Sequence, residues 1–326
     1  MSQMGAIDAY NPASFAPATT VRDWVQLPLG LDSDLELPLI TVRGAQSGPT
    51  ALFVAGVHGD EFEGVATLAS FADRLDPKML HGTVIALPVC NRWAFSGQLR
   101  ATPPEIDGTN LARAFPGDPG GTPTARLAFA LFSLATRLLS DRDLVVDLHS
   151  AGARYRYLTL AGFRDVDSPV RAVSERAARS FAAGAGARLW LIPDGKGMFN
   201  AETTRAGIPT VGAEAPGQGE CRLDDVRRYE EGLLNVLRHQ QMLPGDVITD
   251  GADTARLPSE ILAPADGIFI SYCATGETVS EGDHLGRIID TIGATRSLVI
   301  APRSGEIWAL RTFASIYRGE LVAWIA

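Results

Sequence analysis

Lysine is nearly absent from this chain of 326 residues. Lys78 and Lys196 are the only lysines, and arginine supplies the other 27 of the 29 basic residues. Acidic residues number 38, so the formal net charge is −9. A nucleic-acid-binding protein usually carries a basic face, which this balance does not favour. We therefore expect no nucleic-acid partner.

Cysteine and long apolar runs are also scarce. The three cysteines are widely spaced and form no Cys-x-x-Cys pattern, so neither a disulfide framework nor a thiolate zinc site is indicated. No apolar run approaches the roughly 18 residues that a membrane helix needs. Residues 1–22 lack the basic segment and apolar core of a signal peptide. We expect a soluble cytoplasmic protein with no membrane partner.

Several catalytic motifs are missing as well. The chain has no Gly-x-Ser-x-Gly elbow, no Gly-x-x-x-x-Gly-Lys phosphate loop, and no Gly-x-Gly-x-x-Gly after a predicted strand. These absences disfavour a serine hydrolase, a nucleotide triphosphatase and a Rossmann dehydrogenase. Ser150 remains a weaker candidate for a functional residue.

Apolar runs of strand length alternate with helical periodicity between residues 35 and 242. Strands are predicted at 35–43, 51–57, 82–90, 143–150, 188–192 and 208–213, and helices at 61–75, 124–139, 168–183 and 224–242. Alternation of this kind predicts an α/β fold with a largely parallel sheet. Pro38 indicates an edge position for its strand. Residues 1–20, rich in Ala, Pro, Ser and Thr, are predicted to form a loose arm.

The pattern changes after Pro244, because short β-like runs broken by glycine replace the helices. The motif Ala-Pro-x-x-Gly occurs at 263–267 and again at 301–305. Val279-x-x-Gly-Asp is likewise matched by Ile316-x-x-Gly-Glu. Two copies about 38 residues apart predict a small β sandwich or barrel with internal two-fold symmetry. We thus expect a catalytic domain at 1–255 and a β-rich domain at 256–326.

The stretch Gly-Val-His-Gly-Asp-Glu-Phe-Glu-Gly at 56–64 joins the strand at 51–57 to the following helix. The carboxyl end of a strand is where an α/β sheet usually carries its chemistry. If a helical turn begins near His58, the i,i+3 spacing places His58 and Glu61 on one face. An imidazole and a carboxylate there can bind Zn²⁺, which takes three protein ligands in catalytic sites. The alternative is a solvated helix start.

His149 is the candidate third ligand, because it ends a buried strand as His58 does. Asp147 points to the same side of that strand and can fix the tautomer of a liganding histidine. Glu214 follows the strand at 208–213 and can act as base and acid toward a zinc-bound water. The alternatives are a satisfied core histidine, a strand-end hydrogen bond for Asp147, and a solvated turn residue for Glu214.

The long segment 91–123 carries polar residues suited to binding a substrate. Asn91 and Asn110 are possible anchors, and Arg100 and Arg113 can serve as charge stabiliser and carboxylate clamp. Long irregular segments in compact domains are usually functional or disordered, and the aromatic residues of this one favour function.

Taken together, these motifs resemble the succinylglutamate desuccinylase/aspartoacylase family, relatives of the zinc carboxypeptidases, over roughly residues 35–242. The resemblance rests on the motif at 56–64, Asn91, Arg100, the segment Asp-Gly-Thr-Asn-Leu-Ala-Arg-Ala-Phe-Pro-Gly at 107–117, Asp-Leu-His-Ser at 147–150, and Glu214. It implies a carboxypeptidase-like fold, one Zn²⁺ on His58, Glu61 and His149, and Glu214 as general base and acid. It also implies Arg100 polarising the scissile carbonyl and Arg113 binding the substrate carboxylate.

The reaction that the resemblance implies is hydrolysis of an N-acyl amino acid. Within the family, the length, the loop and the tail resemble the branch that deacetylates N-acetyl-diaminobutyrate. The tail resembles biotinyl and lipoyl domains, although residues 261–326 contain no lysine to accept such a group. We expect the tail to pack on the catalytic domain, narrow the cleft or build a homo-oligomer interface.

One departure from the family pattern concerns the long segment, where Ala112 replaces the second asparagine of the usual Asn-Leu-Asn-Arg. Part of the carboxylate clamp is therefore missing. Two alternative functions stay open. One is a carboxypeptidase acting on peptides, and the other is a non-catalytic protein of the same fold that binds a metal or ligand.

Overall fold

An eight-stranded mixed sheet forms the centre of the larger part of the chain in the computed structural model, which describes residues 6–29, 35–251 and 254–326. The strands of this sheet, in chain order, are β1 (Thr19–Leu27), β2 (Leu35–Arg43), β3 (Gln46–Val54), β4 (His81–Leu87), β5 (Leu144–Ser150), β7 (Leu160–Arg164), β8 (Arg188–Ile192) and β9 (Thr210–Ala215). Their spatial order is β1-β2-β4-β3-β5-β9-β7-β8.

The centre of the sheet is parallel, because β4, β3, β5 and β9 all run in one direction. β2 joins β4, and β7 joins β9, through antiparallel contacts. The carboxyl ends of β3, β5 and β9 therefore meet at one edge of the sheet, where α/β proteins usually bind their ligands. The fold is the predicted α/β class, with a sheet that is mixed rather than purely parallel.

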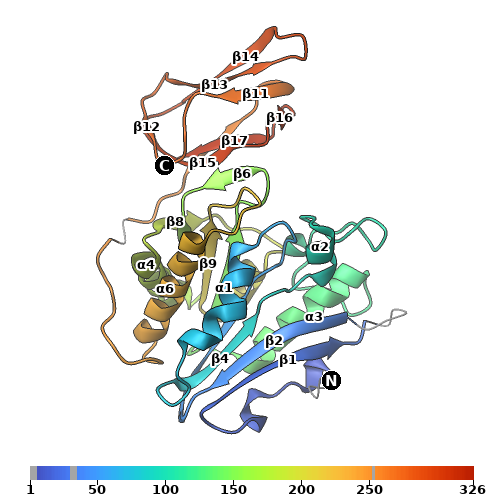
Figure 1. Ribbon diagram of the computed structural model, residues 1–326, viewed down its shortest axis with the longest axis vertical. Coiled ribbons are helices and arrows are strands. Elements are labelled where there is room, and N and C mark those ends of the chain that lie inside the picture. The colour runs from blue at the N-terminus through green and yellow to red at the C-terminus, as the bar shows by residue number, and fades with distance from the viewer. Residues whose placement is uncertain (1–5, 30–34, 252–253) are drawn as a thin grey trace.

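Helices cover both faces of this sheet (Figure 1). They are α1 (Glu63–Phe71), α2 (Arg92–Gly97), α3 (Pro123–Leu138), α4 (Arg171–Ala185), α5 (Phe199–Arg205) and α6 (Leu223–His239), with short 3-10 helices η1 (Ile7–Ala9), η2 (Pro12–Ser14), η3 (Ala72–Arg74) and η4 (Leu111–Arg113). α1, α4 and α6 pack on one face, and α3 and α5 on the other. Among the described helices, none has the length and apolar character needed to cross a membrane.

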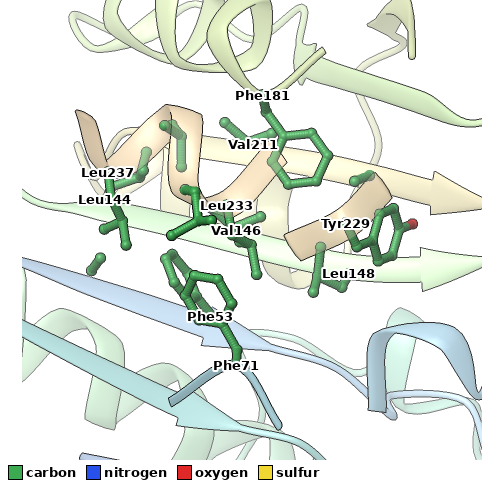
Figure 2. Close-up of a cluster of buried hydrophobic side chains, with 14 of the residues drawn as sticks. Phe53, Phe71, Leu144, Val146, Leu148, Phe181, Val211, Tyr229, Leu233 and Leu237 are labelled. Atoms are coloured by element: carbon green, nitrogen blue, oxygen red, sulfur yellow. The ribbon is translucent and has the colours of Figure 1, made fainter. Parts of the chain in front are cut away.

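The core on the α1, α4 and α6 face is continuous from the first helix to the last (Figure 2). Phe53 of β3 meets Phe71 of α1 edge to face at 5.9 Å between ring centroids. Tyr229 of α6 buries its ring in this cluster, and its hydroxyl donates a hydrogen bond of 2.7 Å to the carbonyl oxygen of His149. Core packing is thereby connected to the end of β5.

The C-terminal strands form two smaller antiparallel layers above the main sheet (Figure 1). They are β10 (Ser259–Leu262), β11 (Gly267–Ser271), β12 (Thr278–Val279), β13 (His284–Ile289), β14 (Thr295–Ile300), β15 (Gly305–Arg311), β16 (Ser315–Ile316) and β17 (Leu321–Ile325). β6 (Tyr155–Tyr157), which follows β5 in the chain, pairs with β15. A segment between two strands of the main sheet thus extends the C-terminal β structure.

The predicted internal symmetry is visible in the hydrogen bonds between the two sequence copies. Gly282 donates from its amide to the carbonyl of Ala301 at 2.9 Å, and Gly319 donates equivalently to Ala263 at 2.9 Å. The return bonds, from the Ala301 amide to Asp283 and from the Ala263 amide to Glu320, measure 2.9 and 2.8 Å. Each copy therefore holds the other through the same pair of bonds.

Two expectations about the N-terminal region are wrong. Pro38 does not mark an edge strand, because β1 pairs along the whole of β2 and aligns Trp24 with Pro38. Residues 6–20 are not a loose arm, since Ile7 and Tyr10 are only 1% and 5% exposed. Residues 1–5 lie outside the described part. β1 was not predicted because it is an edge strand. Polar residues occupy its exposed positions, so it lacks the continuous apolar run of a buried strand.

Trp308 tests how firmly the C-terminal strands are attached. It is 1% exposed and packs against Leu160 of the main sheet. Trp308→Ala should lower the free energy of unfolding by about 3–5 kcal/mol, because it leaves a large cavity at this contact. Chemical denaturation measures the loss. Tyr317→Ala, at a position 67% exposed, should change stability by about 0.5 kcal/mol or less. Equal effects of the two substitutions would contradict this packing.

Candidate active site

Three side chains from two strand ends converge on one point at the carboxyl edge of the sheet. His58 and Glu61 lie in the turn between β3 and α1, and His149 lies in β5. Their ligand atoms all lie within 4.8 Å of one another. Glu61 Oε1 is 2.7 Å from His58 Nδ1, and Glu61 Oε2 is 2.9 Å from His149 Nδ1. The predicted third ligand therefore lies beside the other two.

His58 and Glu61 lie close together in a turn, and not on one face of a helix as their i,i+3 spacing suggested. α1 begins only at Glu63, so the pair precedes the helix. The turn passes very close to α2, because a Cβ added at Gly59 would lie 1.9 Å from the carbonyl oxygen of Ala94. A glycine is required at that approach for steric reasons.

The outer nitrogens of both imidazoles have oxygen partners. His58 Nε2 is 3.2 Å from Asn110 Oδ1, and His149 Nε2 is 3.2 Å from Asp147 Oδ1. Asn110 Oδ1 favours a proton on Nε2 of His58, and the nearby carboxylate charge of Asp147 favours one on Nε2 of His149. Each Nδ1 lone pair is then directed at the Glu61 carboxylate. Lone pairs and a carboxylate at such distances need a positive charge between them. A neutral His, a neutral His and a carboxylate form a donor set that suits Zn²⁺.

The electrostatics of the three groups also favour positive charge at this point. Burial alone would raise the pKa of Glu61, but the facing imidazoles hold that pKa well below its ordinary value. Burial would likewise lower the pKa of His149, but the carboxylates of Asp147 and Glu61 hold it well above its usual range. His58 is the exception, since its burial outweighs Glu61 and lowers its pKa.

Glu214 lies next to His149, because β5 and β9 pair in a register that aligns these two residues. It lies within β9 rather than after it. Its Oε2 is buried without a hydrogen-bond partner in the described part of the chain. Burial, aided by the charge of Glu61, raises the pKa of Glu214 to about 8, against the opposing effect of His149. A carboxylate with a raised pKa can both accept and return a proton near neutral pH.

Two arginines of the predicted loop line the adjoining cavity. Arg100 donates to Glu61 Oε1 at 2.9 Å. Arg113 donates to the carbonyl of Ala112 at 2.7 Å and forms no ion pair with the carboxylates that the structure describes. Burial and the charge of Arg100 lower the pKa of Arg113. Its guanidinium is thus available to an anionic group of a ligand.

The two asparagines of the same loop have different positions. Asn91 is fully buried, accepts the Ala94 amide at the start of α2 and donates to Thr102 at 3.0 Å. It is not among the residues that line the cavity, and its two side-chain bonds fix the start of α2 and the loop at Thr102. Asn110 orients His58 through its Oδ1 and also caps η4. It contacts a candidate metal ligand instead of the cavity.

The sequence did not indicate a second layer of polar side chains behind His149. Asn200 of α5 donates to Asp147 Oδ2 at 3.0 Å and accepts from Arg164 Nε at 2.7 Å. Arg164, in β7, is 7% exposed, and burial lowers its pKa to about 10. Because α5 and β7 were not predicted as elements, neither residue carried a usable signal. Asp147 itself lies where the sequence placed it.

The cavity beside these groups measures about 300 Å³. Its wall includes Tyr157, Trp190 and Trp324, with ring centroids 5.0 Å apart for Tyr157 and Trp324 and 5.2 Å apart for the two tryptophans. Trp324 and Glu260 come from the C-terminal strands. The tail therefore contributes to the wall of the cleft, which is one of the three roles that we expected for it.

The fold and this site are those of a known family of α/β deacylases. Residues 47–240 match the family model of the succinylglutamate desuccinylase/aspartoacylase catalytic domain. The chain belongs to this succinylglutamate desuccinylase/aspartoacylase family. The match spans β3 to α6 and so includes each of the three candidate metal ligands and Glu214.

Individual relatives resemble the chain over nearly its full length. The N-alpha-acetyl-L-2,4-diaminobutyric acid deacetylase of Halomonas elongata is 30% identical over 321 residues, which cover 93% of this chain and 90% of that protein. The succinylglutamate desuccinylase/aspartoacylase structure from Rhodobacter sphaeroides is 29% identical, with a TM-score of 0.83 and coverage of 96% and 97%. The product-bound ectoine utilization protein EutE (DoeB) from Ruegeria pomeroyi is 26% identical, with a TM-score of 0.84 and the same coverage.

The raised pKa of Glu214 predicts a pH-dependent stability difference in the chelator-treated protein. Because the folded-state pKa lies above the unfolded value, the folded state binds more protons between these values, and wild type loses stability as pH rises through about 8. Glu214→Gln removes this loss. The unfolding free energy of this variant relative to wild type should rise by at least about 1.4 kcal/mol between pH 5 and pH 9. That value is the free energy that corresponds to a pKa shift of one unit. A difference that stays constant with pH in urea unfolding would contradict the raised pKa.

Proposed function

We propose that this protein is a zinc-dependent hydrolase that cleaves the amide bond of an N-acyl amino acid. The observation that carries the proposal is the register of β5 and β9, which sets Glu214 directly beside His149 of the His58, Glu61 and His149 set. A base next to a metal-binding triad, at a small cavity with an available guanidinium, suits hydrolysis of a short substrate with a carboxylate.

Each residue has a distinct task in this proposal. When bound, Zn²⁺ acts as a Lewis acid toward the scissile carbonyl and activates water at neutral pH. Glu214 accepts a proton from the attacking water and donates it to the leaving amine, for which a pKa near the working pH is suited. Arg100 stabilises the developing negative charge on the carbonyl oxygen. Asp147 and Asn110 hold the two imidazoles in the tautomer that binds the metal.

The substrate is proposed to be an acetylated amino acid, N-acetyl-diaminobutyrate being the first candidate. The relative from Halomonas elongata is named for that deacetylation, and a cavity of about 300 Å³ suits a short acyl group. Arg113 would bind the substrate carboxylate, as its lack of an ion-pair partner allows. A peptide carboxypeptidase is a weaker alternative, since Trp324 and Glu260 close one side of the cleft.

The rest of the chain fits the same proposal. Residues 1–255 would form the catalytic domain and residues 256–326 a β-rich domain that shapes its cleft. We also propose that the enzyme is cytoplasmic and homo-oligomeric, and light scattering of the purified chain measures the latter directly. A monomer would remove the oligomer interface from the roles of the tail.

The metal assignment predicts that His58→Ala loses zinc and activity together. Removing one of three protein ligands should lower the zinc content from about one ion per chain to near zero, because the two remaining ligands bind weakly. Metal analysis after dialysis measures this, and His284→Ala, at an exposed position of β13, is the matched control. Retention of either stoichiometric zinc or full activity in His58→Ala would refute the assignment.

The reaction class predicts a preference among amides. The zinc-loaded enzyme should release acetate from N-acetyl amino acids and act poorly on dipeptides, since Trp324 and Glu260 narrow one side of the cleft. Glu214→Gln should bind zinc normally while kcat falls about 10²- to 10⁴-fold, the usual contribution of general acid–base catalysis. Preference for dipeptides would favour the carboxypeptidase, and bound zinc without turnover would favour a binding protein.

A further inference from the structure

Glu63 is a buried carboxylate that the proposed chemistry does not use. It opens α1, two residues after Glu61, yet it is only 1% exposed although it is charged and lies in the first helical turn. Carboxylates are rarely buried to this degree without a specific partner. Its side chain does not line the cavity, so it has no place as a substrate ligand.

The partner of Glu63 is a backbone amide 154 residues away. Glu63 Oε1 accepts a hydrogen bond of 2.8 Å from the amide of Gly217, and this bond is buried. Gly217 stands three residues after Glu214, on the segment by which the chain leaves β9. One carboxylate therefore connects the turn that carries Glu61 to the exit of the strand that carries Glu214.

The exit segment has little freedom at Gly217. Gly217 has a φ of +80°, and an added Cβ would lie 2.7 Å from Cβ of Ala151 and 2.8 Å from the carbonyl oxygen of Gly152. The amide of Ala151, which directly follows β5, donates to Ala215 at 3.1 Å. The exits of β5 and β9 are thus packed together, and Glu63 holds them against α1.

The carboxylate of Glu63 interacts with few polar groups: burial raises its pKa and outweighs its own backbone amide, the Ser150 hydroxyl and the Gly217 amide, which lower it. Glu63 Oε2 is buried and has no hydrogen-bond partner among the described residues. Without Glu63, the Gly217 amide would itself be buried and unpaired, which proteins avoid by moving the backbone or admitting water. Either response would shift Glu214, which is three residues away in the chain.

We propose that Glu63 is a positioning residue that fixes Glu214 relative to the His58, Glu61 and His149 set by accepting the Gly217 amide. It acts through the backbone and touches neither metal nor substrate. The inference rests on the proposed function, because it concerns the placement of the proposed base. Misplacing a catalytic group by about 1 Å can cost about 10²-fold in rate.

The test compares three substitutions in the zinc-loaded enzyme. Glu63→Ala removes the acceptor, and kcat on the N-acetyl amino acid should fall about 10- to 100-fold, with KM within about threefold and zinc still equimolar. Glu63→Gln keeps an oxygen acceptor, so its kcat should return to within about threefold of wild type. Asn235→Ala is the matched control, because Asn235 Oδ1 also accepts a backbone amide from a distant segment, that of Ile248, at 2.8 Å in a partly buried bond. It should lower the melting temperature and leave kcat unchanged.

Three results would overturn the inference. An unchanged kcat in Glu63→Ala, a zinc content that falls in parallel with kcat, or a Glu63→Gln variant as slow as Glu63→Ala would each do so. If Glu63→Ala does not fold, Glu63→Asp decides, since the shorter side chain withdraws the acceptor and should lower kcat in the same way. A wild-type enzyme without zinc-dependent turnover would instead remove the proposed function.

Discussion

The buried carboxylate of Glu61 is the constraint on which the rest of the site depends. A carboxylate that is 3% exposed needs compensating positive charge or hydrogen bonds, because burial of an unpaired charge is costly. Here two imidazoles, the amide of Ser150 and Arg100 all face it. These groups surround the Glu61 carboxylate. The need to compensate its charge accounts for the close approach of the turn after β3 to the end of β5.

The sheet supplies that geometry through its parallel centre. Because β3, β5 and β9 run in one direction, their carboxyl ends present the candidate ligands and Glu214 at a common edge. The core then fixes this edge from behind, for example through the bond from Tyr229 of α6 to the His149 carbonyl. The C-terminal strands close the remaining side by bringing Trp324 against Tyr157 and Trp190. The candidate ligands and the C-terminal part of the cleft wall thus come from segments that lie far apart in the chain.

Much of the fold could be predicted from the sequence, because the buried parallel strands β3 and β5 carry continuous apolar runs at 51–54 and 144–146. The strands that were missed have a physical reason. β1 is an edge strand with a polar side, and β6 is three residues long and pairs with the distant strand β15. The edge position predicted from Pro38 was wrong because β1, which pairs with β2 beside Pro38, was not recognised in the sequence. The residue pattern within one strand does not show which strands lie beside it, because strand preferences depend on the packing of neighbouring strands.

The sequence by itself determined the kinds of side chain and their order along the chain: His58, Glu61, His149 and Glu214 after apolar strands, and arginines in a long loop. These residues stand at or near strand ends, and alternating strands and helices predict a parallel sheet, so their meeting at one edge could be foreseen. Only the tertiary structure decided the register that aligns Glu214 with His149, the Arg164 and Asn200 support of Asp147, and the bond from Gly217 to Glu63. These contacts join residues up to 154 positions apart, and their partners are set by packing rather than by any nearby pattern.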